Sequence, residues 1–185
     1  MKPVPKAVTI YTDGACIKNP GPGGYSVVLL HGEHRKELSG GFRLTTNNRM
    51  ELMAAIVGLR ALKRACRVTL YSDSEYLVTS MQAGLPQQWR SRGWRRGKRG
   101  PALNTDLWEQ VLHYCSTHHV TFEWVRGHSG NPENERCDEL SQQAARQVGL
   151  PKDVGYEGTD AARVAIAKAS RRRLVGPAAS FPLPT

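Results

Sequence analysis

The chain has 185 residues, of which 39% are hydrophobic and 23% charged, and its 26 Lys and Arg against 16 Asp and Glu give a formal net charge of +10. This composition is typical of one ordinary globular domain with some residues to spare, and it argues against a disordered chain. The basic excess favours a polyanionic partner, most simply nucleic acid.

The first part of the chain predicts three strands. The apolar stretch AVTIY indicates a buried strand over Ala7–Thr12, and further strands are expected over Gly24–His31 and Lys36–Leu44. The short connections between them predict an antiparallel meander. The Gly40-Gly41 pair suggests a bulge or a close approach of two backbones in the third strand.

The period then changes to i, i+3, i+4 in TTNNRMELMAAIVGLRALKRAC (45–66), which predicts an amphipathic helix. Its polar start and its basic end, Lys63 and Arg64, suit the helix dipole. Two more strands are expected over Arg67–Tyr71 and Val120–Val125. Further helices are expected over Ser74–Met81, over Thr105–Thr117 with Asn104 or Thr105 as cap, and over Glu133–Val148 after an Asn131 N-cap and Pro132.

This order, βββαβααβα, predicts an α/β fold with a mixed five-stranded sheet, in which an antiparallel meander is followed by strands parallel to the first, and with helices on both faces. The pattern weakens beyond Pro151. We expect one folded domain over residues 1–156 and a basic, flexible C-terminal tail over residues 157–185, although residues 160–174 could also be helical. The tail is interpreted either as solubilising or as an extra contact for nucleic acid or a protein partner.

The remaining general features favour a cytoplasmic protein, with a monomer as the default. The four cysteines are scattered without a CxxC pair, which favours reduced thiols over disulfides or a zinc site. No apolar run approaches the roughly 18 residues of a membrane span. The N-terminal MKPVPKAV lacks the apolar core of a signal peptide.

Acidic residues follow two of the predicted strands, Asp13 after the first and Asp73 after the fourth. Adjacent parallel strands would bring them together at one edge of the sheet, where Glu51 and Asp138 could also point. A cluster of carboxylates repels itself and needs a cation, and oxygen ligands favour Mg²⁺ or Mn²⁺. Two such ions about 4 Å apart can clamp a phosphodiester, activating water on one side and stabilising the leaving oxygen on the other.

Each acid also has a purely structural explanation, which taken singly is the more common one. Asp13 could be a turn residue before Gly14, Asp73 could cap the next helix, Glu51 could be a first-turn acid, and Asp138 could pair with Arg136 or Arg146. The placement of two acids at strand ends favours the metal site.

Longer motifs resemble bacterial type 1 ribonuclease H. They are YTDGACIKNPGPGGY, TTNNRMELMAAIVGL, YSDSEY, GWRRG, DLW and WVRGHSGNPENERCDELSQQAA, in the same order from about Ala7 to about Tyr156. The resemblance implies the ribonuclease H-like fold, with residues 1–156 as the catalytic domain. It implies a Mg²⁺-dependent endonuclease that hydrolyses the RNA strand of RNA–DNA hybrids, such as replication primers and R-loops, with two metal ions, leaving 5′-phosphate and 3′-hydroxyl ends.

The resemblance also implies roles for individual residues. The metal-binding catalytic acids are Asp13, Glu51, Asp73 and Asp138. His128 matches the catalytic histidine, which assists proton transfer or product release, and histidine is the residue type suited to proton transfer near neutral pH.

Cutting only RNA in a hybrid requires reading 2′-hydroxyls on one strand and deoxyribose on the other. By resemblance, Asn19, Asn47 and Asn48 contact the hybrid in its minor groove. The backbone around Cys16, together with Glu51, reaches ribose hydroxyls, and Thr46 matches a residue that binds a DNA phosphate. TTNN is equally a good helix-capping segment, so at least one of its residues should cap. Gly14 is expected to let the substrate backbone come close.

The segment QQWRSRGWRRGKRGPA (87–102) holds six cations and no acid, with two interleaved tryptophans. Phosphate contact with aromatic support is one interpretation, and the family's basic protrusion lies here. The expected contacts are Trp89, Arg90, Arg92, Trp94, Arg95 and Arg96. In the alternative, which we favour for Trp94, the tryptophans anchor a solvated loop to the body. Some relatives have a further tryptophan where this chain has Leu85, a difference that bears on how tightly the hybrid is held.

Two other functions stay open at this point. A DNA-directed nuclease or integrase could share the fold, but TTNNRMEL and GHSGNPENERCDE argue against it. A hybrid-binding module without catalysis is the second, and the presence of all four acids argues against that.

Overall fold

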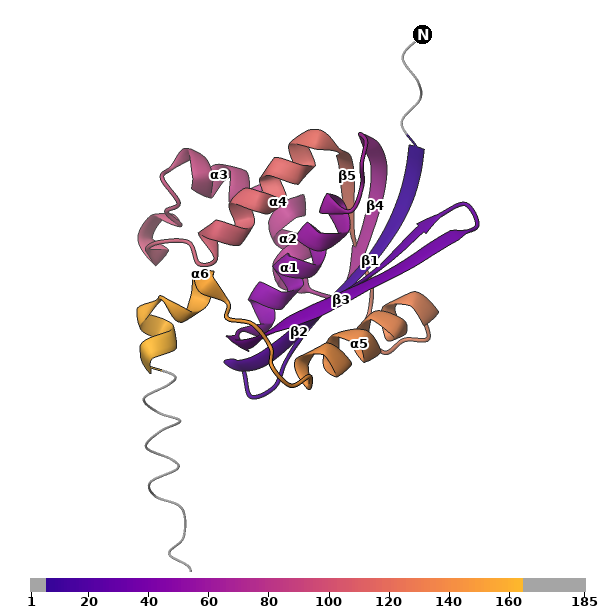
Figure 1. The fold of residues 1–185 in the computed structure, drawn as a ribbon. Helices are drawn as coiled ribbons and strands as arrows, with labels where there is room; N and C mark the ends of the chain where they lie inside the picture. Colours follow the sequence, from indigo (N-terminus) through magenta and orange to yellow (C-terminus); the bar gives the residue numbers. More distant parts are fainter. Residues whose placement is uncertain (1–5, 165–185) are drawn as a thin grey trace, which may run out of the picture.

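A five-stranded sheet in the order β3-β2-β1-β4-β5 forms the centre of the molecule (Figure 1). The structure, a computed structural model, describes residues 6–164. The strands are β1 (Lys6–Cys16), β2 (Gly21–His31), β3 (His34–Thr45), β4 (Cys66–Ser72) and β5 (His119–Trp124). The first three form an antiparallel meander, and β4 and β5 add to β1 in parallel, so the predicted mixed sheet is confirmed.

β1 and β2 are longer than predicted, because their glycines are packing positions within strands and not loop residues. β1 continues through Asp13, which lies opposite Ser26, to Cys16. A side chain at Gly24 would overlap the backbone of Ser141 and Ala145, so glycine there lets a helix lie close on the sheet.

The close approach expected at Gly40-Gly41 is confirmed. The Tyr25 ring covers Gly40, and Gly41 lies against the Gly23 carbonyl. The register irregularity between β2 and β3 lies at Gly21–Gly23.

Helices cover both faces of the sheet, as predicted (Figure 1). One face carries α1 (Asn47–Arg60), α2 (Glu75–Gln82), α3 (Leu85–Ser91) and α4 (Thr105–Thr117), and the other is covered by α5 (Pro132–Ala145). A 3-10 turn, Gly97–Arg99, follows α3, and the short α6 (Val154–Glu157) follows α5. α5 ends at Ala145, earlier than the predicted Val148, and the sequence pattern missed α3 and α6.

The prediction of a one-sided amphipathic α1 is wrong. Buried residues occur all around the helix, from Arg49 to Leu59, because α1 lies between the sheet and α4. From α4, Trp108 is fully buried in the same core as Leu52 and Ile56. A helix covered on two sides loses the polar face that one-sided burial would leave.

The C-terminal end of the described chain packs on this body. Tyr156 and Ala162 are buried, and residues 160–164 are helical. The proposed domain boundary at 156/157 falls inside α6 and stays a prediction. Arg171–Arg173 and the rest of residues 165–185 lie outside the described residues. Within residues 6–164, no helix combines the length and apolar composition needed to cross a bilayer.

Candidate active site

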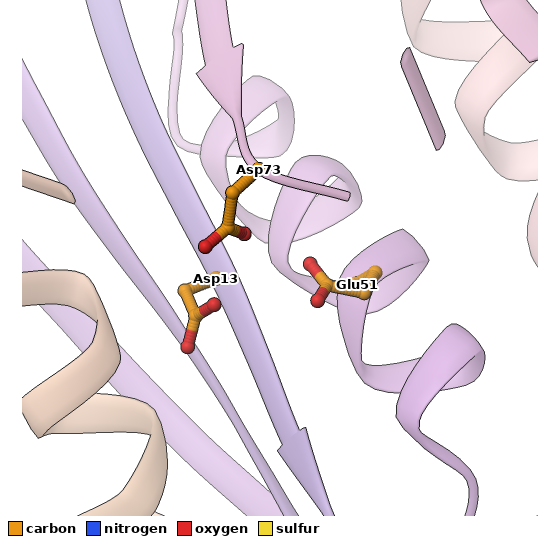
Figure 2. A group of neighbouring side chains, drawn as sticks. All are labelled: Asp13, Glu51 and Asp73. Carbon is orange, nitrogen blue, oxygen red and sulfur yellow. The ribbon is translucent and has the colours of Figure 1, made fainter. Parts of the chain in front are cut away.

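Three carboxylates converge at one end of the sheet: Asp13 in β1, Glu51 in α1 and Asp73 just after β4 (Figure 2). One oxygen from each lies within 4.8 Å of the others. β1 and β4 are parallel neighbours with Thr12 opposite Ser72, so Asp13, the next residue of β1, and Asp73, which follows the end of β4, lie side by side. The expected meeting of Asp13 and Asp73 is therefore explained by the strand pairing.

Gly14 brings the third acid into the cluster. A side chain at this position would overlap the backbone of Met50 and Glu51 at the start of α1. Without a side chain there, α1 can lie against β1 and present Glu51 beside Asp13. Gly14 also lines the groove beside the acids, and the expectation that it lets the substrate backbone come close stays a prediction.

The structural explanations for Asp13 and Asp73 do not hold. Asp13 lies within a strand and not in a turn. The N-cap of α2 is Ser74, whose hydroxyl accepts a hydrogen bond from the Leu77 amide at 3.2 Å, so Asp73 is not the cap. The sheet therefore positions both acids, and neither acts as the turn residue or the helix cap considered above.

The fourth predicted acid, Asp138, lies in α5. Its suggested partner Arg136 is bound instead to Glu37 and Glu139. Asp138 Oδ1 accepts a hydrogen bond of 2.8 Å from Gln142 Nε2. Its charge also raises the pKa of Asp13, although Asp138 lies outside the three-acid cluster.

His128 lies on an exposed loop next to Asp138. Its Nδ1 lies 3.9 Å from Asp138 Oδ2, and 77% of its side chain is exposed. The loop passes close to the cluster, since a Cβ added to Gly127 would lie 2.7 Å from Asp73 Oδ2. The structure therefore brings the predicted histidine to the predicted acids.

The electrostatics of the cluster call for a cation. Burial raises the pKa of Asp13 to about 7, with a smaller increase from the charges of Asp73 and Asp138, against the lowering effect of a hydrogen bond from Ser141. Burial also raises the pKa of Glu51 well above its usual value, and Asp13 and Asp73 add to this. Glu51 Oε2 is buried and has no hydrogen-bond partner within residues 6–164. Buried like charges with an unpartnered oxygen fit a hard divalent cation, for which all-oxygen donors are suited.

The residues expected to contact substrate lie beside these acids. Thr46 is the N-cap of α1 and accepts from the Arg49 amide at 3.4 Å, which confirms the capping prediction. The Asn47 amide donates to Asn19 Oδ1 at 3.2 Å, and Asn48 is exposed.

A groove of about 410 Å³ runs next to the acid cluster. It is lined by the expected Cys16 and Asn47 and by Asp138, together with two residues that the sequence analysis missed, Gln142 and Arg146. Both follow Asp138 at helical spacing, i+4 and i+8, which was the signal available in the sequence.

The basic segment is more ordered than a solvated loop. Trp89 in α3 packs edge-on against Trp108, with 6.1 Å between ring centroids, and Trp94 is half-buried against the same core. The anchoring alternative therefore holds for Trp94 and describes Trp89 as well. Leu85 is the first residue of α3.

Some arginines of this segment bind other parts of the chain, and others do not. Arg90 pairs with Glu109 at 3.3 Å, and Arg96 donates to the Pro101 carbonyl. Arg92 and Arg95 are exposed and make no ion pair with any described residue. Lys98 and Arg99 are likewise exposed and without an ion pair among the described residues, so the segment offers several uncompensated charges to a polyanion.

The family model described as RNase H matches residues 5–146. The chain is 66% identical over 151 residues to a ribonuclease H of Syntrophus aciditrophicus, covering 82% of this chain and 87% of that protein. It is 52% identical over 157 residues to a ribonuclease HI of Synechocystis sp., covering 84% and 98%. The fold of LC9-RNase H1, a type 1 RNase H with the type 2 active-site motif, is similar, with a TM-score of 0.70, 30% identity, and coverage of 98% of this chain and 96% of that one. LC11-RNase H1 in complex with RNA/DNA hybrid has a TM-score of 0.58 and 26% identity over 75% of this chain and 96% of that one.

Proposed function

The chain belongs to the RNase H family, and from that premise we propose that it is an endonuclease that hydrolyses the RNA strand of RNA–DNA hybrids. The observation that carries the proposal is the convergence of Asp13, Glu51 and Asp73, with one oxygen of each within 4.8 Å of the others. Relatives named ribonuclease H, and a structural neighbour that was solved with an RNA/DNA hybrid, support the choice of substrate.

In this proposal the four acids Asp13, Glu51, Asp73 and Asp138 would hold two divalent ions, Mg²⁺ or Mn²⁺, when substrate is bound. When bound, the ions would supply an activated water and stabilisation of the leaving oxygen, and the products would carry 5′-phosphate and 3′-hydroxyl ends. Asp13 and Asp73 would hold the centre of the site, and His128 on its exposed loop would move a proton or assist product release.

Substrate binding is proposed for residues around the groove and on the basic segment. The Thr46 hydroxyl uses a lone pair as a cap, so its proton is still available for a DNA phosphate. Asn19, Asn47, Asn48 and the backbone at Cys16 would face the minor groove of the hybrid. Arg92 and Arg95 would add phosphate contacts beyond it.

One assay separates the proposed activity from its rivals. Uniform RNA–DNA hybrid, DNA duplex and RNA duplex are each incubated with the protein and Mg²⁺, and Asp13→Asn serves as the control. We expect cutting of the RNA strand of the hybrid alone, and none with the variant. Cutting of the DNA duplex would support a DNA-directed nuclease, and hybrid binding without cutting would support a binding module.

The remaining expectations follow from this activity and stay predictions. They are a catalytic domain over residues 1–156, a monomer, a cytoplasmic location and a role in removing primers and R-loops. The tail over residues 157–185 is proposed as solubilising or as an added contact.

A further inference from the structure

Two adjacent residues of α5 each hydrogen bond a different acid of the site. Ser141 is fully buried, and its hydroxyl donates to Asp13 Oδ2. Gln142 donates from Nε2 to Asp138 Oδ1 at 2.8 Å. Ser141 and Gln142 stand three and four positions after Asp138, so all three lie on one face of the helix.

The Ser141 hydroxyl has one proton and two possible acceptors. The Asp138 carbonyl, 2.9 Å away, is the local acceptor that a serine in a helix usually finds. The Asp13 carboxylate is the stronger acceptor when it is ionised, because hydrogen bonds to charged groups are stronger than those to neutral ones. A bound cation keeps Asp13 ionised, and it therefore favours donation of the Ser141 hydroxyl to Asp13 over donation to the Asp138 carbonyl.

The Gln142 side chain is held at its other end. Its Oε1 accepts from the Arg146 guanidinium at 3.3 and 3.4 Å. With the amide oxygen toward Arg146, the amide nitrogen is turned toward Asp138. Arg146, Gln142 and Asp138 thus form a ladder along α5 that orients one carboxylate.

We propose that Ser141 and Gln142 are positioning residues of the metal site, each holding one oxygen of an acid so that the other oxygen is presented to the cation. Glu51 has a similar arrangement. Asn47 Nδ2 lies 3.5 Å from Glu51 Oε1, while Glu51 Oε2 is left unpartnered within residues 6–164. Residues that hold metal ligands in this way strongly affect metal affinity. The inference rests on the proposed function, because it takes the acids as the metal ligands.

Ser141→Ala tests the first contact, and Ser26→Ala is a matched control. Ser26 is also fully buried, lies opposite Asp13 in the sheet, and donates to the Cys137 carbonyl of the same helix at 2.7 Å, so its removal costs a similar bond without touching an acid. Mg²⁺ is titrated calorimetrically into each protein without substrate. We expect the dissociation constant to rise about tenfold for Ser141→Ala. For Ser26→Ala it should stay within twofold of wild type.

Gln142→Leu tests the second contact, with Gln143→Leu, its exposed neighbour, as control. Because Gln142 also lines the groove, kinetics must separate positioning from substrate contact. A positioning role predicts a kcat about tenfold lower at fixed Mg²⁺, with a KM for the hybrid within twofold of wild type. A raised KM with unchanged kcat and unchanged Mg²⁺ affinity would overturn the role for Gln142.

The outcomes separate this inference from the proposed function. If the wild-type protein does not cut the hybrid, the proposed function fails, whatever the Mg²⁺ titration shows. If it cuts the hybrid and Ser141→Ala binds Mg²⁺ as tightly as wild type, the inference alone is wrong. Should Ser141→Ala fail to fold, Ser141→Cys keeps the shape of the side chain, slightly enlarged, and a weak donor, and we expect it to bind Mg²⁺ with intermediate affinity.

Discussion

Two buried charged residues stand two positions apart on α1, and their surroundings are opposite. The Arg49 side chain is 3% exposed and is fully paired, with bonds of 2.7 and 2.9 Å to Asp153 and of 2.9 and 2.7 Å to Asp106. Glu51 is buried among acids of its own sign and has an oxygen without a partner in the described chain. One site is closed by the protein itself, and the other calls for a cation from outside.

The paired site holds distant parts of the chain together. Asp106 lies in the first turn of α4 and Asp153 precedes α6, and Thr45 at the end of β3 also donates to Asp153 at 2.6 Å. Burial alone would lower the pKa of Arg49, but the hydrogen bonds to the two aspartates raise it above its usual range. The difference between Arg49 and Glu51 fits the proposed function: the buried charge that maintains the fold is compensated within the chain, whereas the one proposed to bind metal is not.

The largest expected effect comes from removing an uncompensated charge. Asp13→Asn should lower hybrid cleavage by about a thousandfold, because a metal site supplies several kcal/mol of transition-state stabilisation. The same variant should be more stable than wild type without metal near pH 8, by about 4 kcal/mol in the free energy of unfolding.

The sign of the stability change follows from the pKa of Asp13. Burial raises it from 3.8 to about 7 in the folded protein, so the folded state binds more protons than the unfolded state between these values. Stability is therefore lost as the pH rises through this window, and asparagine, which does not ionise, avoids the loss. Urea unfolding in a metal chelator measures it, and a variant less stable than wild type near pH 8 would contradict the comparison.

Breaking the compensated site should affect stability first. Asp153→Ala leaves Arg49 with a single partner and should cost about 3 kcal/mol of unfolding free energy, since a buried charge loses half of its compensation. Cleavage by the folded protein should change much less than in Asp13→Asn. Glu109→Ala, which removes the partner of Arg90 in a pair whose two side chains are both half-exposed, is the control and should cost much less. Equal losses of unfolding free energy in the two variants would show that burial of the ion pairs around Arg49 does not determine their contribution to stability.

The acid cluster should also make stabilisation by Mg²⁺ depend on pH. Protons and metal compete for Asp13 and Glu51, whose pKa values are raised by burial. At a Mg²⁺ concentration about ten times the dissociation constant, Tm should rise by about 4 °C near pH 8 and hardly at all near pH 5. Thermal unfolding with NaCl at matched ionic strength is the control. An equal shift at both pH values would argue against binding at these acids.

Local patterns in the sequence were enough to predict the sheet and the acids at the ends of its strands. They could not show that β1 continues through Asp13, because the glycines that suggested a loop serve contacts with α1 and α5. The bond between Ser141 and Asp13 joins residues 128 positions apart, and the partners of Arg49 lie 57 and 104 positions away. Such contacts depend on how the helices and strands pack against one another. Hydrophobic periodicity indicates local secondary structure only, so it could not predict them.

The smallest expected effect concerns surface arginines of the basic segment, which also differ in whether an acid compensates their charge. Arg92 and Arg95 have no acidic partner in the described chain, whereas Arg90 is paired with Glu109. If uncompensated cations are the ones that meet phosphate, Arg92→Ala with Arg95→Ala should reduce the slope of log K against log salt by about 2 for hybrid binding. Arg90→Ala should reduce it less, because Glu109 already offsets part of that charge. Binding is measured in the Asp13→Asn background so that the hybrid stays intact, and equal slopes in all three proteins would show that these three arginines do not contact phosphate.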